Sequence, residues 1–460
     1  MTPKKRIAVL IINRQFIRSW IDTGLITKLA VSGSFDVTIF APQDVYDKIS
    51  TKVEFKIENL GNVVVSKTTL HTIGMGLVNN RKLSGTFDWK IKRQFLPQTY
   101  LLPKDGSAIF RAKWFFRSIR KIVGNTIDNK ITVLYLFKPA QILIRRYLRF
   151  LNEKLEIPTQ IKSFNPDWLI LPSASAHGIT NDCIVGAKKI GLKTIIAIDN
   201  WDHLTGKSTY PTKPDFFTVM GKRCVDHAVK IHNCDPAIIL PYGLPRFDVY
   251  RELNHLCATK DRSSKLKILY CGFAMAHSEK FIVDSIADYF HQKYGTNRVE
   301  IHYRPHPGPS PRNDDYEIRN SNIFVTKYED LDRTAMPNMD EGFIKELSTS
   351  NVIVGAPTTL LIEAMLMKRP VVLDLIKDKY HRTSSGVISR KFTHILDLIE
   401  IDVIPRGETI SQLISEIELQ ITKETDCAHY PVEHLYDTND ARYQHQLLEF
   451  LLSPQHLKID

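Results

Sequence analysis

The chain has 460 residues, of which 43% are hydrophobic and 24% charged, and it carries a formal net charge of +12. This length is enough for two domains of ordinary size, and the composition is that of a soluble globular protein. No apolar run is long enough to span a membrane, and the basic N-terminal stretch has too short an apolar part for a signal peptide. The six cysteines include no C-x-x-C pair. We therefore expect reduced thiols in a cytosolic compartment, with neither a disulfide framework nor a zinc site.

The first half opens with an alternation of strand and helix. Residues 6–12 form an apolar strand, 16–31 a helical stretch, and 35–40 a second strand. This spacing predicts the start of a Rossmann-like domain. A G-x-G-x-x-G motif is missing, so the sequence gives no support for dinucleotide binding. Asn13 and Arg14 follow the first strand; they could contact an acceptor, but a solvated loop explains them more simply.

Residues 81–150 differ in character from the rest of the chain. They contain 16 Lys and Arg against three Asp, which accounts for the whole positive excess. Apolar residues are interleaved with these charges, as in 141–151, which predicts a basic helical insert. Such an insert could lie on anionic lipid headgroups or could pack on its own domain with its charges solvated. No recognised nucleic-acid-binding module is present, so we do not expect nucleic acid as a partner.

Polar side chains follow two neighbouring strands in the next segment. Strand 168–171 runs into a loop that ends at His177, and strand 193–198 runs directly into Asp199 and Asp202. The carboxyl ends of strands are where a catalytic base belongs in this architecture. Asp and Asn after a strand are also common turn residues. His177, Asp199 and Asp202 are therefore candidate bases, and a structural role remains open for each one of them.

The strand–helix pattern restarts after a Pro- and Gly-rich stretch at 241–248 and a polar stretch at 259–265. We predict domains at 1–245 and 261–430, with residues 431–460 forming a helix that packs back on the first domain. Strand 266–271 leads into a loop that begins at Gly272 and ends at His277, followed by a helix with Ser278 as its N-cap. Gly272 allows close approach of a ligand, and the helix start offers N–H donors to a diphosphate.

A second candidate phosphate contact follows the strand at 300–303. Arg304 and His306 stand in a proline-rich stretch that includes Pro307, so the backbone is held in an extended path. Arg can form two parallel bonds to a phosphate, and His can donate a hydrogen bond or carry a proton. The alternative is a buried structural histidine held between prolines.

The region 350–374 reads as strand, turn, helix and strand, the pattern of a parallel βαβ unit. Thr358 or Thr359 can cap the helix, and a helix start preceded by two hydroxyls is a natural seat for phosphate. Glu363 lies in the first turns of that helix. Any α/β crossover shares this pattern, so the phosphate interpretation depends on its combination with His306.

Taken together, these motifs resemble those of GT-B glycosyltransferases. The nearest relatives by motif are bacterial surface-polysaccharide enzymes, including capsule and lipopolysaccharide sugar transferases and CDP-glycerol glycerophosphotransferases. His306-Pro307 and Thr358-Thr359 match the His-Pro and Ser/Thr pairs that hold the donor nucleotide in sialyl- and Kdo-transferases. Residues 199–204 resemble a W-D-N-L-like signature of polysaccharide-biosynthesis proteins. Nonhydrolysing UDP-sugar 2-epimerases share this fold and place a His-Pro pair similarly.

The resemblance implies an α/β protein of two Rossmann-like domains facing a cleft, with acceptor bound by the first domain and nucleotide sugar by the second. It implies that His306 and the helix starts at Ser278 and Thr358/Thr359 stabilise charge on the leaving phosphate, helped by Arg304. Glu363 would bond the donor ribose, and Asp199, Asp202 or His177 would take the acceptor proton.

No metal or further cofactor is expected. The one D-x-D, residues 330–332, reads as a solvated loop. The expected acceptor is a glycan or a lipid-linked sugar, and the expected location is the cytoplasm at the inner face of the membrane. The alternatives are a CDP-glycerol-type polyol-phosphate transferase, a 2-epimerase, and a non-catalytic membrane-surface scaffold.

Overall fold

The structure is a computed structural model of the whole chain. It describes all residues except 1–2, 14–15, 51–54, 64–66, 96–138, 140, 145, 147–154, 174–177, 208, 254–264, 307–316, 327–340, 424–426, 433–434, 437–441 and 455–460. The chain divides into two compact units. The N-terminal unit comprises Met1–Pro97, Arg117–Arg246 and Glu433–Asp460, and the C-terminal unit comprises Gln98–Phe116 and Phe247–Val432.

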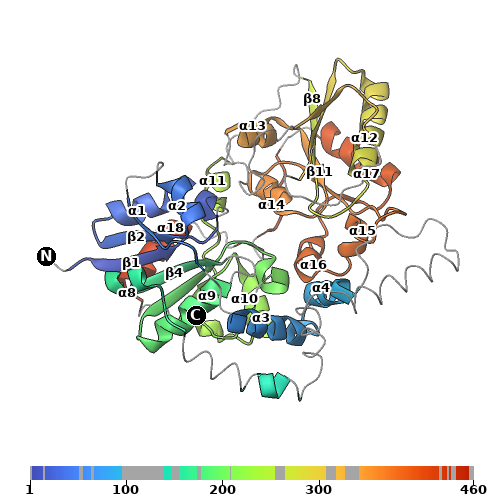
Figure 1. The fold of residues 1–460 in the computed structure, drawn as a ribbon. Helices are drawn as coiled ribbons and strands as arrows, with labels where there is room; N and C mark the ends of the chain where they lie inside the picture. Colours follow the sequence, from blue (N-terminus) through green and yellow to red (C-terminus); the bar gives the residue numbers. More distant parts are fainter. Residues whose placement is uncertain are drawn as a thin grey trace. The chain divides into compact units, whose positions relative to one another are not determined.

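The N-terminal unit is built on a parallel sheet of seven strands in the order β3-β2-β1-β4-β5-β6-β7 (Figure 1). The order reverses between β1 and β4, as in a doubly wound Rossmann-like sheet. This confirms the fold predicted for the first half. The strands are β1 (Lys5–Leu10), β2 (Phe35–Ala41), β3 (Lys56–Asn59), β4 (Trp168–Ser173), β5 (Lys193–Ile198), β6 (Phe216–Thr218) and β7 (Ile239–Leu240).

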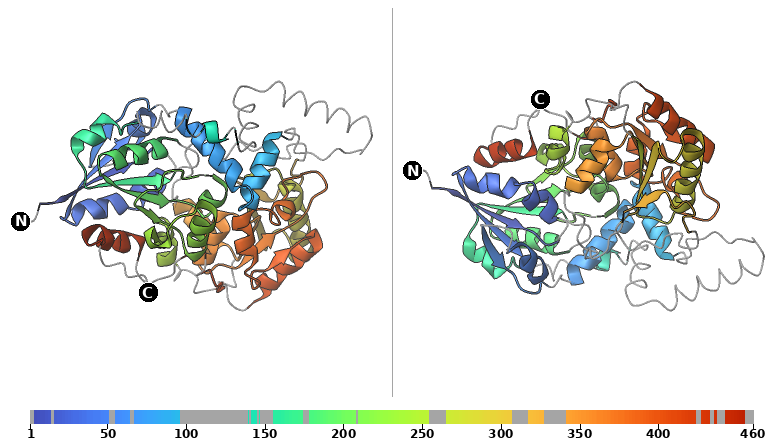
Figure 2. Two further views of the ribbon diagram at one scale, coloured as in Figure 1. Left: turned by 90° about the horizontal axis from the view of Figure 1, so that it is seen from below. Right: turned by 90° about the horizontal axis from the view of Figure 1, so that it is seen from above.

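Helices lie on both faces of this sheet (Figure 2). The single helical stretch predicted for 16–31 is wrong in one respect, because Gly24 adopts a left-handed conformation with φ of 72° and separates two shorter segments. The helical elements are η1 (Ile17–Asp22), α1 (Leu25–Val31), α2 (Gln43–Ile49), α3 (Lys67–Asn80), α4 (Gly85–Phe95), α8 (Thr159–Phe164), α9 (Gly178–Lys189), η2 (His203–Lys207), α10 (Lys222–His232), η3 (Pro236–Ile238) and α18 (Tyr443–Leu452).

The last helix, α18, belongs to the N-terminal unit and lies beside α1 (Figure 2). The Phe450 ring packs against Phe216 and Trp168, with centroid distances of 4.8 and 5.6 Å. The Tyr443 hydroxyl lies 2.9 Å from the Thr218 hydroxyl. Because Phe450, Trp168 and Tyr443 are buried, α18 completes one side of the hydrophobic core of this unit.

The C-terminal unit repeats the architecture with a six-stranded parallel sheet in the order β10-β9-β8-β11-β12-β13. The reversal of order falls between β8 and β11. Its strands are β8 (Leu266–Cys271), β9 (Val299–Arg304), β10 (Ile323–Val325), β11 (Val352–Gly355), β12 (Val371–Asp374) and β13 (Arg406–Gly407). Its helices are α11 (Phe247–Glu252), α12 (Glu279–Tyr294), α13 (Glu341–Thr349), α14 (Thr359–Leu366), α15 (Ser385–Ile388), α16 (Thr393–Ile399) and α17 (Ile410–Thr422).

The core of the C-terminal unit lies between the sheet and the helices α12 and α17. Ile268, Val354 and Val372 of the sheet pack with Phe290 of α12 and Leu413 of α17 in one hydrophobic cluster. The two central strands, β8 and β11, carry almost continuous apolar runs because helices cover both of their faces (Figure 1). Burial of each such side chain contributes about 1.5–3 kcal/mol.

One prediction from composition is wrong. The cysteines were all expected as reduced thiols, but Cys427 is disulfide-bonded. Cys183, Cys224, Cys234 and Cys271 are free and buried, as expected for core residues. Spacing could not reveal this bond, because pairing depends on which segments the fold brings together.

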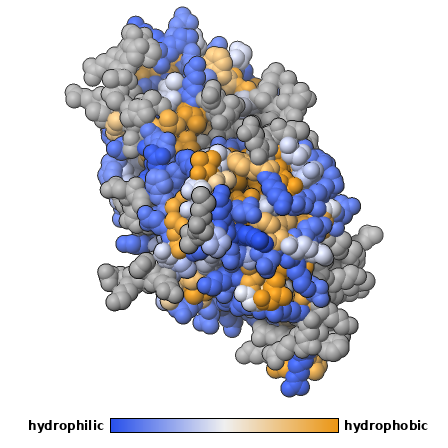
Figure 3. Space-filling view, turned by 90° about the vertical axis from the view of Figure 1, so that its left-hand side faces the viewer, coloured by the Kyte–Doolittle hydropathy of each residue, from blue (hydrophilic) through white to orange (hydrophobic). Residues whose placement is uncertain are grey.

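Within the described part of the chain, no helix is both long and apolar enough to cross a membrane. The face on the left-hand side of Figure 1 shows hydrophilic and hydrophobic side chains interspersed (Figure 3). Most of the basic segment 81–150 lies outside the described residues. Its described parts include most of α4 and a short helical piece in which Ile142 and Leu143 are 56% and 67% exposed.

Candidate functional site in the C-terminal unit

The strand ends of β11, β8 and β9 lie side by side at one edge of the second sheet. Gly355 of β11 pairs with Cys271 of β8, and Cys271 pairs with Arg304 of β9. The loops that follow these strands therefore begin at the same level on three adjacent strands. They also flank the point where the strand order reverses, which is where open α/β sheets bind ligands.

Gly272 is required by the close approach of two of these loops. A Cβ atom added at Gly272 would lie 2.7 Å from the backbone nitrogen of His306 and 2.8 Å from Cα of Pro305. The Gly272 N–H also donates to the carbonyl oxygen of Arg304 at 2.8 Å. The structure thus brings Gly272 and His306, predicted separately, directly together. His306 is half-buried, and Pro307 lies outside the described residues.

Arg304 is held in place by its own unit. Its guanidinium donates to Glu346 Oε2 at 3.0 Å and lies over the ring of Phe343, 4.4 Å from the centroid. The side chain is 7% exposed. This ion pair fixes one edge of the guanidinium and offsets part of its positive charge. Arg304 would therefore stabilise a nearby anion mainly through the fixed position of its guanidinium and less through its net charge.

Thr358 occupies the N-cap position of α14, but its side chain does not cap the helix. The residue is extended, with φ of −137° and ψ of 166°, and it makes no side-chain capping bond. Among the described residues its Oγ1 is buried and has no hydrogen-bond partner. The capping role expected for Thr358 is therefore wrong, because its hydroxyl accepts no N–H of α14. Thr38 and Thr180 also carry buried hydroxyls without a partner among the described residues, so this feature acquires meaning only together with the position of Thr358 at the start of α14.

Two further predicted residues belong to α14. Thr359 is its first residue and is half-buried, whereas Glu363 is 1% exposed. Glu363 is therefore not a solvated residue on the surface of this helix. The helix begins directly after the β11 loop, so its N-terminal N–H groups lie at the same sheet edge as Gly272 and His306.

His277 is buried between two carboxylates. Its Nε2 lies 2.8 Å from Asp374 Oδ2 and its Nδ1 lies 3.3 Å from Asp378 Oδ2. Burial alone would lower the pKa of His277, but the charge and hydrogen bond of Asp374 and the contact with Asp378 outweigh it and raise the pKa to about 10. Burial would likewise raise the pKa of Asp374, yet the His277 charge and the Tyr270 hydroxyl hold it below its usual value.

The same cluster occupies the start of α12. The Ser278 N–H donates to Asp378 Oδ2 at 3.0 Å, and Asp378 also accepts bonds from the backbone and the ring of His381. A diphosphate at this helix start would have to displace Asp378. His277 and Ser278 are thus bonded inside the unit, and their arrangement fits a structural clamp between the β8–α12 loop and the segment after β12.

Sequence reasoning missed most of this cluster. Asp374 is the last residue of β12. Asp199 was singled out as a candidate in the first half because it lies at a strand end, and the same reasoning would have identified Asp374. Glu279, the first residue of α12, is 4% exposed, and its carboxylate accepts bonds from the Tyr303 hydroxyl and the Phe273 N–H. The contacts of Asp378, His381 and Ser385 depend on tertiary folding and left no signal in the sequence.

The candidate bases lie in the N-terminal unit. Asp199 follows β5, is 8% exposed, and pairs with the buried Arg246, whose Nη1 donates to the Asp199 carbonyl at 2.7 Å and lies 3.3 Å from Oδ2. Asp202 is partly exposed and lies 3.0 Å from Lys207 Nζ. Both carboxylates are thus ion-paired, but the side chain of Asp202 is 20% exposed and that of Asp199 is 10% exposed. His177 lies outside the described residues.

His203, next to Asp202, is a titratable group within the stretch 199–204 that resembles a W-D-N-L-like signature. No role was predicted for it. It is 5% exposed, and burial, followed by the charge of Lys207, lowers its pKa to about 3. The imidazole is therefore neutral at neutral pH. The nearby His232, at the end of α10, is also buried and bonds the Leu204 carbonyl through Nε2 at 2.6 Å, which ties α10 to the segment η2 that begins with His203.

A metal centre finds no support in the described residues, where no group of three or more His, Cys, Asp or Glu side chains is arranged to hold an ion. Residues 330–332 lie outside the described part of the chain.

Comparisons with known proteins show the fold. No protein-family model matches the chain, and no curated protein matches it significantly. A crystal structure of a UDP-GlcNAc 2-epimerase from Neisseria meningitidis bound to UDP-GlcNAc is 10% identical, with a TM-score of 0.50 over 97% of this chain and 99% of that one. A protein from Listeria monocytogenes, provisionally assigned as a UDP-N-acetylglucosamine 2-epimerase, is 12% identical, with a TM-score of 0.51 over 98% and 97%. These likenesses confirm the predicted GT-B fold of two Rossmann-like domains.

Proposed function

We propose that this protein is a GT-B glycosyltransferase that moves a sugar from a nucleotide-activated donor to a hydroxyl of a polysaccharide or lipid-linked acceptor. The observation that carries the proposal is the convergence of His306, Gly272 and the Thr358–α14 start on three adjacent strands in register. These residues were singled out independently in the sequence as phosphate-binding types.

On the donor side, the N–H groups at the start of α14 and the unsatisfied Thr358 hydroxyl bind the diphosphate of the nucleotide. His306 donates a hydrogen bond to the leaving phosphate, and Arg304 adds positive charge at the end of β9. Glu363 binds the ribose. His277 and Ser278 support this site by holding the β8–α12 loop, since their polar groups already bind Asp374 and Asp378.

On the acceptor side, the base is a carboxylate of the N-terminal unit or His177. The acceptor oxygen bonds to the anomeric carbon while the bond from that carbon to the phosphate oxygen breaks. The acceptor proton goes to the base, and the bonding electrons leave with the nucleotide diphosphate. Asp202 suits this role better than Asp199, because it is more exposed and its ion-pair partner is the partly exposed Lys207, whereas Asp199 is paired with the buried Arg246.

The basic segment 81–150 holds the transferase at the anionic inner face of the cytoplasmic membrane. There the enzyme has access to lipid-linked acceptors. The exposed apolar pair Ile142 and Leu143 supports this, because apolar side chains between basic residues favour the headgroup boundary. Ile144 of the same piece packs against a small cluster formed by Met75, Val78 and Ile91, which fixes the pair on the surface.

The second candidate function is a nonhydrolysing UDP-sugar 2-epimerase. The observation that favours it is that the two solved structures described above, with TM-scores of 0.50 and 0.51, carry this name. An epimerase interconverts nucleotide sugars without an acceptor and needs acid and base groups around the sugar itself. A CDP-glycerol-type polyol-phosphate transferase would use the same His306 and Thr358 contacts with a different leaving group.

A nucleotide panel separates these functions. We expect CMP, CDP, UDP or GDP to raise the melting temperature of the protein, and the matching nucleotide sugar to release nucleotide only when an acceptor is added. Conversion of UDP-GlcNAc without acceptor would identify an epimerase instead.

The phosphate role of His306 is tested in the same assay. His306→Ala should weaken nucleotide binding and reduce turnover by roughly a hundredfold, the size of effect seen when one charge-stabilising donor is removed. Unchanged binding and turnover in this variant would refute the proposed donor site.

A further inference from the structure

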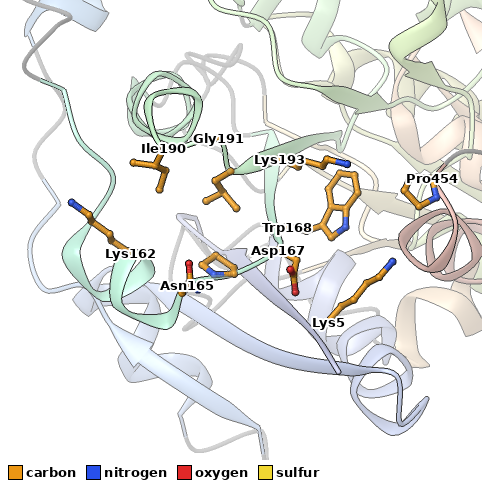
Figure 4. Close-up of a pocket in the computed structure, with 11 residues that line it drawn as sticks. Lys5, Lys162, Asn165, Asp167, Trp168, Ile190, Gly191, Lys193 and Pro454 are labelled. Atoms are coloured by element: carbon orange, nitrogen blue, oxygen red, sulfur yellow. The ribbon is translucent and has the colours of Figure 1, made fainter. Parts of the chain in front are cut away.

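A cavity of about 620 Å³ lies at the opposite edge of the N-terminal sheet, where the strands begin (Figure 4). Lys5, Trp168 and Lys193, which line it, are the first residues of β1, β4 and β5. These three strands are neighbours in the sheet. The cavity is therefore separate from the strand ends that carry the candidate bases, and its volume is in the range of small-molecule sites.

The charges around this cavity are unbalanced. Three lysines, Lys5, Lys162 and Lys193, line it together with one carboxylate, Asp167. Asp167 Oδ2 already accepts the backbone N–H of Arg6 at 2.7 Å. Among the described residues, the ammonium groups of Lys162 and Lys193 have no hydrogen-bond or ion-pair partner. The cavity thus carries more positive than negative charge, since three ammonium groups face one carboxylate.

Two of the lysines are held in place. Lys5 Nζ donates to the carbonyl oxygens of Leu451 and Leu452, both at 2.8 Å, at the end of α18. Lys193 Nζ lies over the Trp168 ring, 5.3 Å from its centroid. The complementarity between basic residues and helix C-termini accounts for Lys5. It does not account for Lys193, which faces an aromatic ring.

Trp168 supplies an unused donor. Its side chain is buried, the residue being only 2% exposed, and it packs against Phe216 and Phe450. Within the described part of the chain the indole nitrogen has no hydrogen-bond partner, and unlike that of Trp20 it is not itself buried, so it is open to the cavity. Figure 4 shows the indole nitrogen on the side of Asp167 and Lys5, toward the cavity. A fixed N–H in a cavity that is also lined by lysine ammonium groups is suited to an anionic oxygen.

We propose that this cavity binds a phosphorylated ligand, with a phosphate oxygen accepting the Trp168 Nε1–H and the charge met by Lys193 and Lys5. The side chains of Ile190 and Leu192 provide an apolar wall for the rest of the ligand. The phosphate belongs either to a soluble phosphate ester or to the headgroup of an anionic lipid. The site is independent of the donor-binding proposal, because it uses none of the same residues.

Indole resonances of protein labelled with ¹⁵N at tryptophan test this proposal. The resonance missing from Trp168→Phe assigns Trp168, and we expect it to shift when wild-type protein is titrated with pyrophosphate or glycerol phosphate. Lys193→Met should weaken this binding by roughly tenfold, as loss of one charge-assisted contact does. Lys188→Met is the matched control, because Lys188 is exposed in the last turn of α9 and does not line the cavity.

Vesicles distinguish the two sources of phosphate. A shift with phosphatidylglycerol vesicles but not with the soluble esters assigns the ligand as a lipid headgroup, and a shift with the esters assigns a soluble ligand. Neutral phosphatidylcholine vesicles control for apolar adsorption. The proposal is overturned if the Trp168 resonance responds to none of these probes, or if Lys193→Met and Lys188→Met weaken binding equally.

Discussion

At the scale of single residues, the hydroxyl of Thr358 provides a test of the proposed donor site, because it makes no capping bond to α14 and has no partner among the described residues. Thr383 offers the contrast, because its hydroxyl donates to the Ala276 carbonyl at 2.8 Å. The two residues therefore respond differently to the same substitution.

We predict that Thr358→Val leaves the free energy of unfolding unchanged or raises it by about 1 kcal/mol, because it removes a buried polar atom that has no partner. Nucleotide binding should weaken at the same time. Thr383→Val should lower the free energy of unfolding by about 1–3 kcal/mol, since the Ala276 carbonyl loses its donor. Urea unfolding and nucleotide titration of both variants check this. Loss of stability in Thr358→Val with intact nucleotide binding would assign that hydroxyl to the fold.

The buried His277 cluster makes stability depend on pH. The pKa of His277 rises from its ordinary 6.5 to about 10 on folding, so its charged form stabilises the folded state. That contribution is complete below pH 6.5 and is lost as the pH rises through about 10. The lowered pKa values of Asp374 and Asp378 act in the opposite direction, giving stability at neutral pH that is lost in acid.

We predict that His277→Gln destabilises the protein at neutral pH by about 3–5 kcal/mol, because it leaves buried carboxylates without a cation. The variant should also show a flatter decline of stability between pH 6.5 and about 10 than the wild type. Urea unfolding across this range measures both effects. His429→Gln, at an exposed position, is the control and should keep the wild-type profile. A wild-type decline that survives in His277→Gln would place the titrating group elsewhere.

At the scale of elements, α18 is a helix whose contribution is packing. Its Phe450 fills the space against Trp168 and Phe216, whereas the adjacent Leu452 is 40% exposed. Amphipathic spacing predicted a helix here, and burial of one face explains why it forms at the end of the chain.

We predict that Phe450→Ala destabilises the N-terminal unit by about 3–5 kcal/mol, the usual cost of removing a buried aromatic side chain. Leu452→Ala should change stability by less than about 0.5 kcal/mol, as expected for an exposed site. Thermal unfolding followed by near-ultraviolet circular dichroism distinguishes the two. Equal effects of both substitutions would mean that α18 does not form part of the core.

At the scale of the whole molecule, the positive charge of the chain is concentrated in residues 81–150. If this segment holds the protein at a membrane, the exposed Ile142 and Leu143 insert among the headgroups. Replacing both with Glu should lower binding to vesicles containing phosphatidylglycerol by about tenfold or more, because apolar contact is lost and negative charge is added. Co-sedimentation measures this. If vesicle binding depends on salt but is unchanged when Ile142 and Leu143 are replaced, apolar insertion is excluded and only electrostatic attraction holds the protein at the membrane.

The sequence by itself determined the architecture. Regular alternation of apolar strands and helices predicts parallel sheets, because only that arrangement buries strands on both faces. The same reasoning placed Gly272, His306 and Thr358 at strand ends, since a parallel sheet brings all its carboxyl ends to one edge.

Only the tertiary structure decided which polar groups those residues meet. Asp378 occupies the start of α12, Arg246 pairs with Asp199, and Asp374 secures His277, each from a segment distant in sequence. Cys427 forms a disulfide that spacing did not reveal. Periodicity reports which face of an element is buried, but a hydrogen bond or ion pair depends on angstrom-scale placement of side chains from separate elements. That placement is fixed only when the whole core packs.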